Sequence, residues 1–110
     1  MNNTRHIVLD LETLGRDDNA CIVAIGAQVY DEETDSLGDS FYQAVDITSC
    51  DESWIDTDTV RWWMKQSDAA RAAFNEKGVP LAAALGDFAM WIPADACLWG
   101  NGATFDNVLL

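Results

Sequence analysis

One short segment joins an apolar run to a pair of carboxylates, and it limits what this chain can become. Ile7–Leu9 are large and apolar, and Asp10 and Glu12 follow them two positions apart. In a β-strand the side chains at positions i and i+2 lie on one face, about 7 Å apart along the chain. Carboxylates held that close repel each other unless a cation or a proton joins them. The segment predicts either a site for a hard divalent cation or a strand end at which both carboxylates are hydrated.

The length and composition favour a single domain. The 110 residues are 49% hydrophobic, which is enough for a core. No apolar run is long enough to cross a membrane and the N-terminus does not resemble a signal peptide, so we expect a cytoplasmic protein without a membrane partner. The three cysteines have no CxxC spacing and His6 is the only histidine, so we expect reduced, mostly buried thiols and no zinc site.

The net charge of −13 argues against tight, non-specific binding of nucleic acid. Six Lys and Arg stand against nineteen Asp and Glu, and the acids gather in Asp31–Asp39 and Asp46–Asp58, which we interpret as solvated loops. Action at nucleic-acid ends is compatible with this charge if metal ions neutralise the pocket. The cationic residues available to line the approach would then be Arg5, Arg61, Lys65, Arg71 and Lys77.

Hydrophobic patterning predicts three strands in succession over Arg5–Leu11, Cys21–Tyr30 and Asp39–Val45. In the first strand, Ile7, Leu9 and Leu11 share one face. The second is apolar nearly throughout, which predicts cover on both of its faces. Because the links between the strands are short, we expect an antiparallel meander.

The second half of the chain predicts helices and one further strand. We expect helices over Thr59–Gln66 (capped by Thr57 or Asp58), over Asp68–Asn75 (capped by Ser67) and from Pro80 to Pro93, then a strand over Ala96–Gly100 and a helix from Phe105 onward. The third helix carries a core-facing stripe of Leu81, Leu85, Phe88 and Ile92. The order predicts a mixed α/β domain, a meander followed by helices and an αβ unit. Asp106 would lie at the end of the fourth strand and face Asp10 if the two strands are neighbours.

Two motifs in this order resemble a known family. Asp10-Leu11-Glu12-Thr13 resembles the first exonuclease motif of the DEDD, or DnaQ-like, 3′–5′ exonucleases, and Asn101-Gly-Ala-Thr-Phe105-Asp106 resembles the second. The segments Thr59-x-x-Trp62-Trp63-x-x-Gln66-Ser67 and Trp99-Gly-Asn-Gly are similar to a bacterial and phage branch of exoribonuclease-like proteins. The resemblance implies an RNase H-like fold, whose three antiparallel strands followed by αβ units agree with the order above.

The resemblance also implies two-metal hydrolysis of phosphodiester bonds at the 3′ end of RNA or single-stranded DNA, with Mg²⁺ or Mn²⁺. Asp10 would bridge both ions, Glu12 would bind one and Asp106 would hold the other. By the same analogy Thr13 would bond the 3′ end, and Asn101 would orient a phosphate or simply serve as a turn residue. Leu14 would either wedge against the terminal base or pack in the core, and Phe105 would either stack or support the site. Of the adjacent Trp62 and Trp63, one would pack in the core while the other lines the groove.

The chain departs from the family in one respect. The family's third motif supplies a fourth carboxylate and a His or Tyr as general base, and no residue here matches that motif before the sequence stops at Leu110. We therefore expect residues 1–110 to be a single, incomplete, C-terminally truncated exonuclease domain, weak or inactive alone. Completion by another chain or by a homo-oligomer is a second expectation, and the motifs admit both RNA and single-stranded DNA as the substrate.

A rival function belongs to a different class. The acidic charge and the missing motif also fit a catalytically silent interaction protein that mimics nucleic acid. Retention of Asp10, Glu12 and Asp106 favours the exonuclease, because a silent protein has no chemical need for them.

Overall fold

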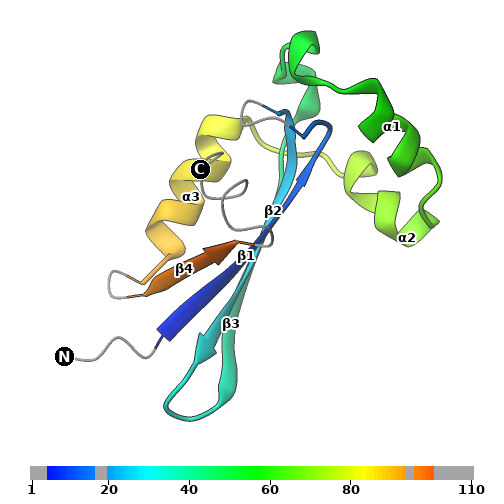
Figure 1. The fold of residues 1–110 in the computed structure, drawn as a ribbon. Helices are drawn as coiled ribbons and strands as arrows, with labels where there is room; N and C mark the ends of the chain where they lie inside the picture. The colour runs from blue at the N-terminus through cyan, green and yellow to red at the C-terminus, as the bar shows by residue number, and fades with distance from the viewer. Residues whose placement is uncertain (1–4, 17–19, 94–95, 101–110) are drawn as a thin grey trace.

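A four-stranded sheet with the order β3-β2-β1-β4 forms the centre of the computed structural model, which describes residues 5–16, 20–93 and 96–100 (Figure 1). The strands are β1 Arg5–Thr13, β2 Ile22–Asp31, β3 Ser36–Ala44 and β4 Cys97–Gly100. β1 pairs antiparallel with β2 and β2 with β3, whereas β4 lies parallel to β1. The predicted meander and mixed α/β class are confirmed, although β1 ends later and β3 begins earlier than expected.

The main core lies between one face of the sheet and helix α3, Leu81–Trp91. Alternate residues of β1 are buried there, as the pattern of Ile7, Leu9 and Leu11 predicts. Ala84 and Phe88 of α3 are buried against them, and the rest of the predicted helical stripe packs at the margin of this core. At the start of β2, Ile22–Ile25 are all buried, so that both faces are covered there as expected.

A second core cluster lies at the end of the sheet beneath α1, Thr57–Met64, and α2, Asp68–Arg71 (Figure 1). Three short 3-10 turns accompany these helices: η1 Ile47–Ser49, η2 Glu52–Trp54 and η3 Ala72–Asn75. The buried residues of the second cluster are Leu14, Cys21, Val23, Ala24, Trp63 and Ala73. Within the described part of the chain, no helix combines the length and the apolarity that crossing a membrane requires.

Two helix predictions need correction. The cap of α1 is Asp56, whose side chain accepts the Thr59 N–H, rather than Thr57 or Asp58. The helix predicted over Asp68–Asn75 is a single α-turn capped by Ser67 that continues as η3. Alanine-rich sequence favours helix without distinguishing α from 3-10 hydrogen bonding over one turn, so the division could not be predicted.

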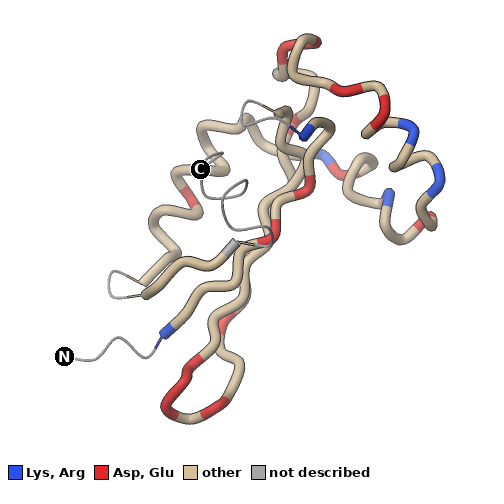
Figure 2. Tube along the Cα trace, in the orientation of Figure 1, with Lys and Arg blue, Asp and Glu red and all other residues tan. Residues whose placement is uncertain are grey.

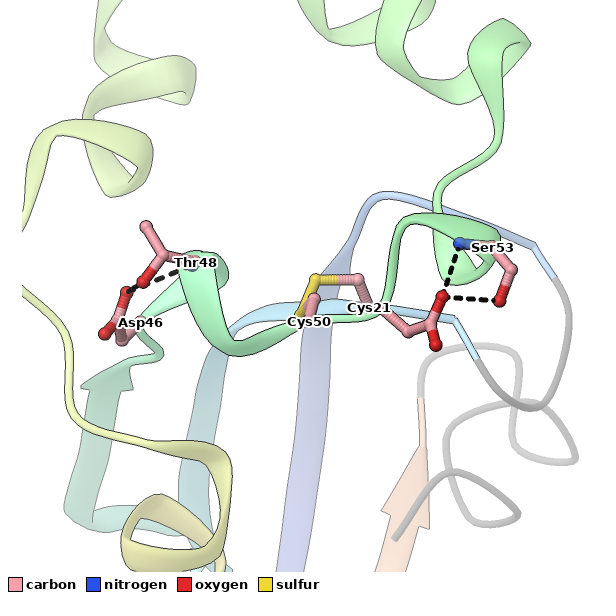
Figure 3. Close-up of a disulfide and its surroundings, with 6 residues drawn as sticks. Cys21, Asp46, Thr48, Cys50 and Ser53 are labelled. Atoms are coloured by element: carbon pink, nitrogen blue, oxygen red, sulfur yellow. Dashed lines mark hydrogen bonds between the residues drawn. A yellow bond between two sulfur atoms is a disulfide. The ribbon is translucent and has the colours of Figure 1, made fainter.

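The expectation of reduced thiols is wrong for two of the three cysteines. Cys21 and Cys50 form a disulfide, with their Cα atoms 5.8 Å apart (Figure 3). Spacing along the sequence did not indicate this bond, because the fold alone brings the start of β2 beside the 46–56 segment. Disulfides are rare in cytosolic proteins, so the bond lends no support to a cytoplasmic location, which stays a prediction.

A close backbone contact at Gly78 fixes the segment between η3 and α3. A Cβ at this position would lie 2.3 Å from the backbone carbon of Val45, so only glycine fits. The adjacent Val79 donates its N–H to the carbonyl of Ala44 at 3.2 Å and accepts the N–H of Asp46 at 2.7 Å. The end of β3 is thereby joined to the segment that carries Glu76.

Loss of the Cys21–Cys50 disulfide is expected to lower the free energy of unfolding by about 3.6 kcal/mol, because a covalent link between residues 29 positions apart restricts the unfolded chain. Urea unfolding followed by circular dichroism, with and without dithiothreitol, measures the difference. Cys50→Ser should lose the same stability and no longer respond to the reductant, whereas Cys97→Ser should respond as the unaltered chain does. Equal stability of the oxidised and reduced chains would contradict the prediction.

Candidate functional site

The two carboxylates singled out in the sequence lie on the face of β1 that does not pack against α3. Asp10 is exposed and Glu12 is half-buried, while the residues that alternate with them are buried in the core. In the sheet register Asp10 lies opposite Gly26 of β2, which lies opposite Tyr42 of β3. Residues directly opposite in antiparallel strands share a face, so Asp10, Gly26 and Tyr42 form one row.

A cleft of about 870 Å³ opens over this end of β1. Its size falls within the range of about 300–1,000 Å³ that is typical of small-molecule sites. Besides Asp10 and Glu12, the lining comprises Leu11, Thr13, Gly15, Arg16, Asp58, Thr59, Trp62, Trp63 and Ala70. The cleft therefore has a carboxylate floor from β1 and a partly aromatic wall from α1.

The surroundings of Glu12 disfavour the charged form of its carboxyl group. Its pKa is raised above the usual 4.5, first by burial, then by the charge of Asp10 and then by that of Glu76. Its Oε2 atom is buried and has no hydrogen-bond partner among the described residues. An unpaired buried carboxylate oxygen costs free energy, and a bound cation would remove that cost. The donor chemistry of this pair thus fits a hard divalent ion.

Tyr42 and Glu76 extend the acidic end of the sheet, and the sequence alone did not reveal them. The Tyr42 hydroxyl donates to Glu76 Oε1 at 3.3 Å. Although Tyr42 is about half-exposed, its pKa is raised to about 12, by burial first and then by the charges of Glu76 and Glu12. Because their charges act on one another, Glu12, Tyr42 and Glu76 belong to a single electrostatic environment.

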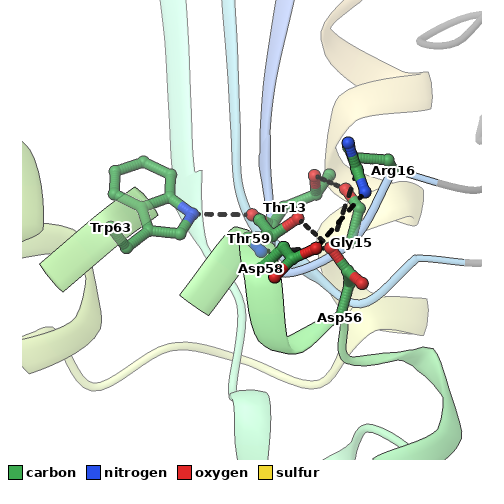
Figure 4. A network of polar contacts seen from close by, with 7 residues as sticks. All are labelled: Thr13, Gly15, Arg16, Asp56, Asp58, Thr59 and Trp63. Atoms are coloured by element: carbon green, nitrogen blue, oxygen red, sulfur yellow. Dashed lines mark hydrogen bonds and ion pairs between the residues drawn. The ribbon is translucent and has the colours of Figure 1, made fainter. Parts of the chain in front are cut away.

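The adjacent tryptophans of α1 differ in burial, as predicted, although both line the cleft. Trp63 is buried, and its Nε1–H donates to the carbonyl of Thr13 at 2.8 Å (Figure 4). Trp62 meets it edge to face, with ring centroids 4.9 Å apart, and is 54% exposed on the cleft wall. The indole ring of Trp63 fixes α1 against β1, whereas the exposed ring of Trp62 is available to contact a ligand.

Backbone hydrogen bonds hold α1 beside the carboxylates. Leu14 donates its N–H to the carbonyl of Cys21, and its own carbonyl accepts the N–H of Asp56, at 2.9 and 2.8 Å. Cys21 donates in turn to the carbonyl of Trp54 at 3.1 Å. These bonds and the disulfide tie the end of β1 to the segment that leads into α1, so the cleft wall has a fixed position.

Comparisons with known proteins agree with this architecture. The family model described as 3′–5′ exoribonuclease Rv2179c-like domain matches residues 5–110. The chain belongs to this family. A search of curated proteins found no match.

Among solved structures, this exoribonuclease-like domain is similar to the nuclease domain of 3′hExo, described as a DEDDh family member bound to rAMP. The TM-score is 0.62 and the sequence identity is 12%, and the match covers 96% of this chain and 57% of that one. For the cell-death related nuclease CRN-4 the TM-score is 0.59 and the sequence identity is 14%, and the match covers 89% of this chain and 35% of that one. A structure described as a full-length 3′-exonuclease has a TM-score of 0.61 and 11% sequence identity. That match covers 99% of this chain and 52% of the other. The DnaQ-like fold is confirmed, and the domain spans between about a third and somewhat over half the length of these proteins.

The structure describes only part of the predicted site. Asn101, Phe105 and Asp106 lie outside the described residues, so their roles stay predictions. β4 is the parallel neighbour of β1, with Gly100 opposite Leu9. The prediction that Asp106 faces Asp10 required these two strands to be neighbours, and they are. Within residues 5–16, 20–93 and 96–100, no three His, Cys, Asp or Glu side chains are grouped so as to hold a metal ion.

Thr13 and Leu14 have different environments. Thr13 lines the cleft, and its hydroxyl donates to the carbonyl of Gly15 at 2.7 Å, which leaves the hydroxyl oxygen as an acceptor. Leu14 is buried in the second core cluster and does not line the cleft, which agrees with the packing alternative for this residue.

The cap of α1 is expected to make the stability of the exoribonuclease-like domain sensitive to acid. Hydrogen bonds from the Thr59 hydroxyl and N–H hold the pKa of Asp56 below its usual 3.8, with a smaller contribution from Arg16. The stability that depends on this carboxylate is present above the unfolded-state pKa and is lost as the pH falls through the lower folded-state value.

Asp56→Asn keeps a capping side chain that does not titrate, so its melting temperature should decline less between about pH 5 and pH 2 than that of the unaltered domain. Thermal unfolding followed by circular dichroism measures this, with Asp56→Ser as a second non-titrating cap. Parallel declines in all three proteins would show that Asp56 is not the source of the acid sensitivity.

Proposed function

We propose that this domain acts on the 3′ end of RNA or single-stranded DNA as a metal-dependent 3′–5′ exonuclease. The observation that carries the proposal is the pair Asp10 and Glu12 on the floor of an open cleft, with a buried Glu12 oxygen that has no hydrogen-bond partner in the described part of the chain. Membership of the Rv2179c-like family supports the reaction class. The fold likeness to a nuclease domain bound to rAMP supports RNA as the first substrate to test.

The residues present fit the donor set for Mg²⁺ or Mn²⁺. Asp10 and Glu12 would hold the ions, and Asp106 would complete the set through the second motif. A pair of divalent ions, when bound, stabilises the charge that develops on a phosphodiester during hydrolysis. A general base and a fourth carboxylate would come from a further segment or from a second, completing chain.

The protein's own side chains would bind and orient the terminal nucleotide. Trp62 offers an exposed ring for stacking a base, and base–aromatic stacking tolerates any base because each has a π-face. The free acceptor on the Thr13 hydroxyl would take a hydrogen bond from a sugar hydroxyl. Binding against these groups would place the 3′ end over Asp10 and Glu12.

A second candidate function, a catalytically silent acidic interaction protein, is supported by the net charge of −13. Such a protein would occupy a basic partner as a nucleic-acid mimic. The acidic residues on its surface would then be required for binding, whereas the buried Glu12 oxygen, which has no partner among the residues that the structure describes, would have no role in it.

Titration calorimetry with Mn²⁺ distinguishes the two functions. We expect saturable binding by the unaltered chain and a loss of affinity of about tenfold or more in Asp10→Asn, since ligand charge governs the affinity for hard cations. Asp58→Asn, on the cleft wall formed by α1, is the matched control and should bind Mn²⁺ nearly as the unaltered chain does. An absence of binding, or equal binding by Asp10→Asn, would count against a metal site.

Trp62→Leu is expected to raise the Kd for a short single-stranded RNA about tenfold, the loss of one base stack. Fluorescence anisotropy of a 5′-labelled RNA measures the Kd. Trp99→Leu removes a tryptophan of similar exposure (55%) that does not line the cleft, and it should leave the Kd unchanged. Equal Kd values for both variants would exclude stacking on Trp62.

A further inference from the structure

The cleft carries a single positive charge among its described residues. Arg16 is the only Lys or Arg in its lining, which also contains the carboxylates of Asp10, Glu12 and Asp58. Figure 2 shows most of the other cationic positions on and around α1 and α2, at the same end of the molecule but outside the lining. An anionic ligand that enters the cleft therefore meets Arg16 as its direct cationic contact.

Arg16 projects from a rigid base. A Cβ on the preceding Gly15 would lie 2.9 Å from the Cβ of Ala20 and 3.0 Å from the carbonyl oxygen of Trp54, so the backbone is tightly enclosed there. The Gly15 carbonyl also accepts the Thr13 hydroxyl at 2.7 Å. The position of the Arg16 backbone is thus fixed relative to the carboxylates of β1, while its side chain is 75% exposed.

The present partners of Arg16 hold it only weakly. Its Nε lies 3.6 Å from Asp56 Oδ2, and its Nη2 lies 4.0 Å from Asp58 Oδ2 (Figure 4). Both distances exceed the length of a hydrogen bond, and exposed ion pairs of this kind add little stability. Asp56 Oδ2 is in addition engaged by the hydroxyl and the N–H of Thr59, at 2.8 and 3.0 Å.

We propose that Arg16 is a phosphate-binding residue for the polynucleotide, held between Asp56 and Asp58 until a substrate phosphate displaces these carboxylates. The proposal rests on the proposed function and names the group that offsets the acidity of the cleft. A phosphate in the cleft presents two oxygens to the planar guanidinium, a stronger arrangement than two long single contacts. Asp58 accordingly acts as a competing anion that weakens substrate binding.

The test measures binding by fluorescence anisotropy, with a short 5′-labelled single-stranded RNA whose phosphorothioate linkages resist hydrolysis, in Mg²⁺ at a series of KCl concentrations. Arg16→Ala should raise the Kd at least about fivefold and reduce the slope of log Kd against log salt by about one. Arg16→Lys should recover the slope but only part of the affinity, because lysine cannot bind a phosphate through a planar fork.

Asp58→Asn tests the competing anion. It should lower the Kd about twofold to fivefold when Arg16 is present and have a smaller effect in the Arg16→Ala background, a non-additivity that a double-mutant cycle measures. Glu52→Gln, which removes one negative charge outside the cleft, is the control for general electrostatics. Circular dichroism melts of every variant establish that the folded state is retained.

Each outcome bears on a separate statement. A folded, unaltered chain that does not bind the RNA would remove the proposed function and this inference with it. Binding by the unaltered chain with the same Kd and salt slope in Arg16→Ala would overturn the inference alone. An equal effect of Asp58→Asn in both backgrounds would overturn the competition between Asp58 and the phosphate.

Discussion

The alternation of side chains along β1 is the constraint on which the rest of this molecule depends. One face of the strand supplies Ile7, Leu9 and Leu11 to the core beneath α3, and the other presents Asp10 and Glu12. Because the period of a strand is two, a shift of one residue would bury the carboxylates and expose the apolar residues. The free energy of core packing therefore also keeps the carboxylate pair in position.

The second requirement is a fixed wall opposite the carboxylates. The 46–56 segment has little regular structure, yet backbone hydrogen bonds and the Cys21–Cys50 disulfide attach it to the ends of β1 and β2. The Nε1–H of Trp63 adds a third attachment at Thr13. Main-chain hydrogen bonds and one covalent bond thus act together with the second core cluster, in which Ile55 and Trp63 pack, to hold the cleft wall in place.

Local and periodic features of the structure could be predicted from the sequence. The strand faces, the stripe of α3 and the carboxylate pair follow from spacing along one element, since the geometry of an isolated strand or helix determines which residues share a face. The two motifs, together with the order of elements, indicated the DnaQ-like fold.

Contacts between distant elements could not be predicted in this way. The disulfide, the Tyr42–Glu76 hydrogen bond and the position of Arg16 each depend on how elements pack. Arg16 was not among the cationic residues expected to line the approach, because its place in the cleft depends on the enclosed backbone at Gly15. The register that places Tyr42 of β3 in one row with Asp10 of β1 could not be predicted from the hydrophobic pattern of either strand alone.

The parallel pairing of β1 with β4 has a consequence for the order of folding. β1 is synthesised before β4, with β2, β3 and the helices between them, and Leu98 of β4 pairs beside Ile7 of β1. Until β4 arrives, one edge of the strand that carries the carboxylates has unpaired N–H and C=O groups, a template for pairing with other chains. Pairing between strands so far apart in the sequence is slow, because the chain between them must first close into a loop. The early meander therefore keeps this edge open until β4 has been made, and pairing of this edge with another chain is a route to misassembly.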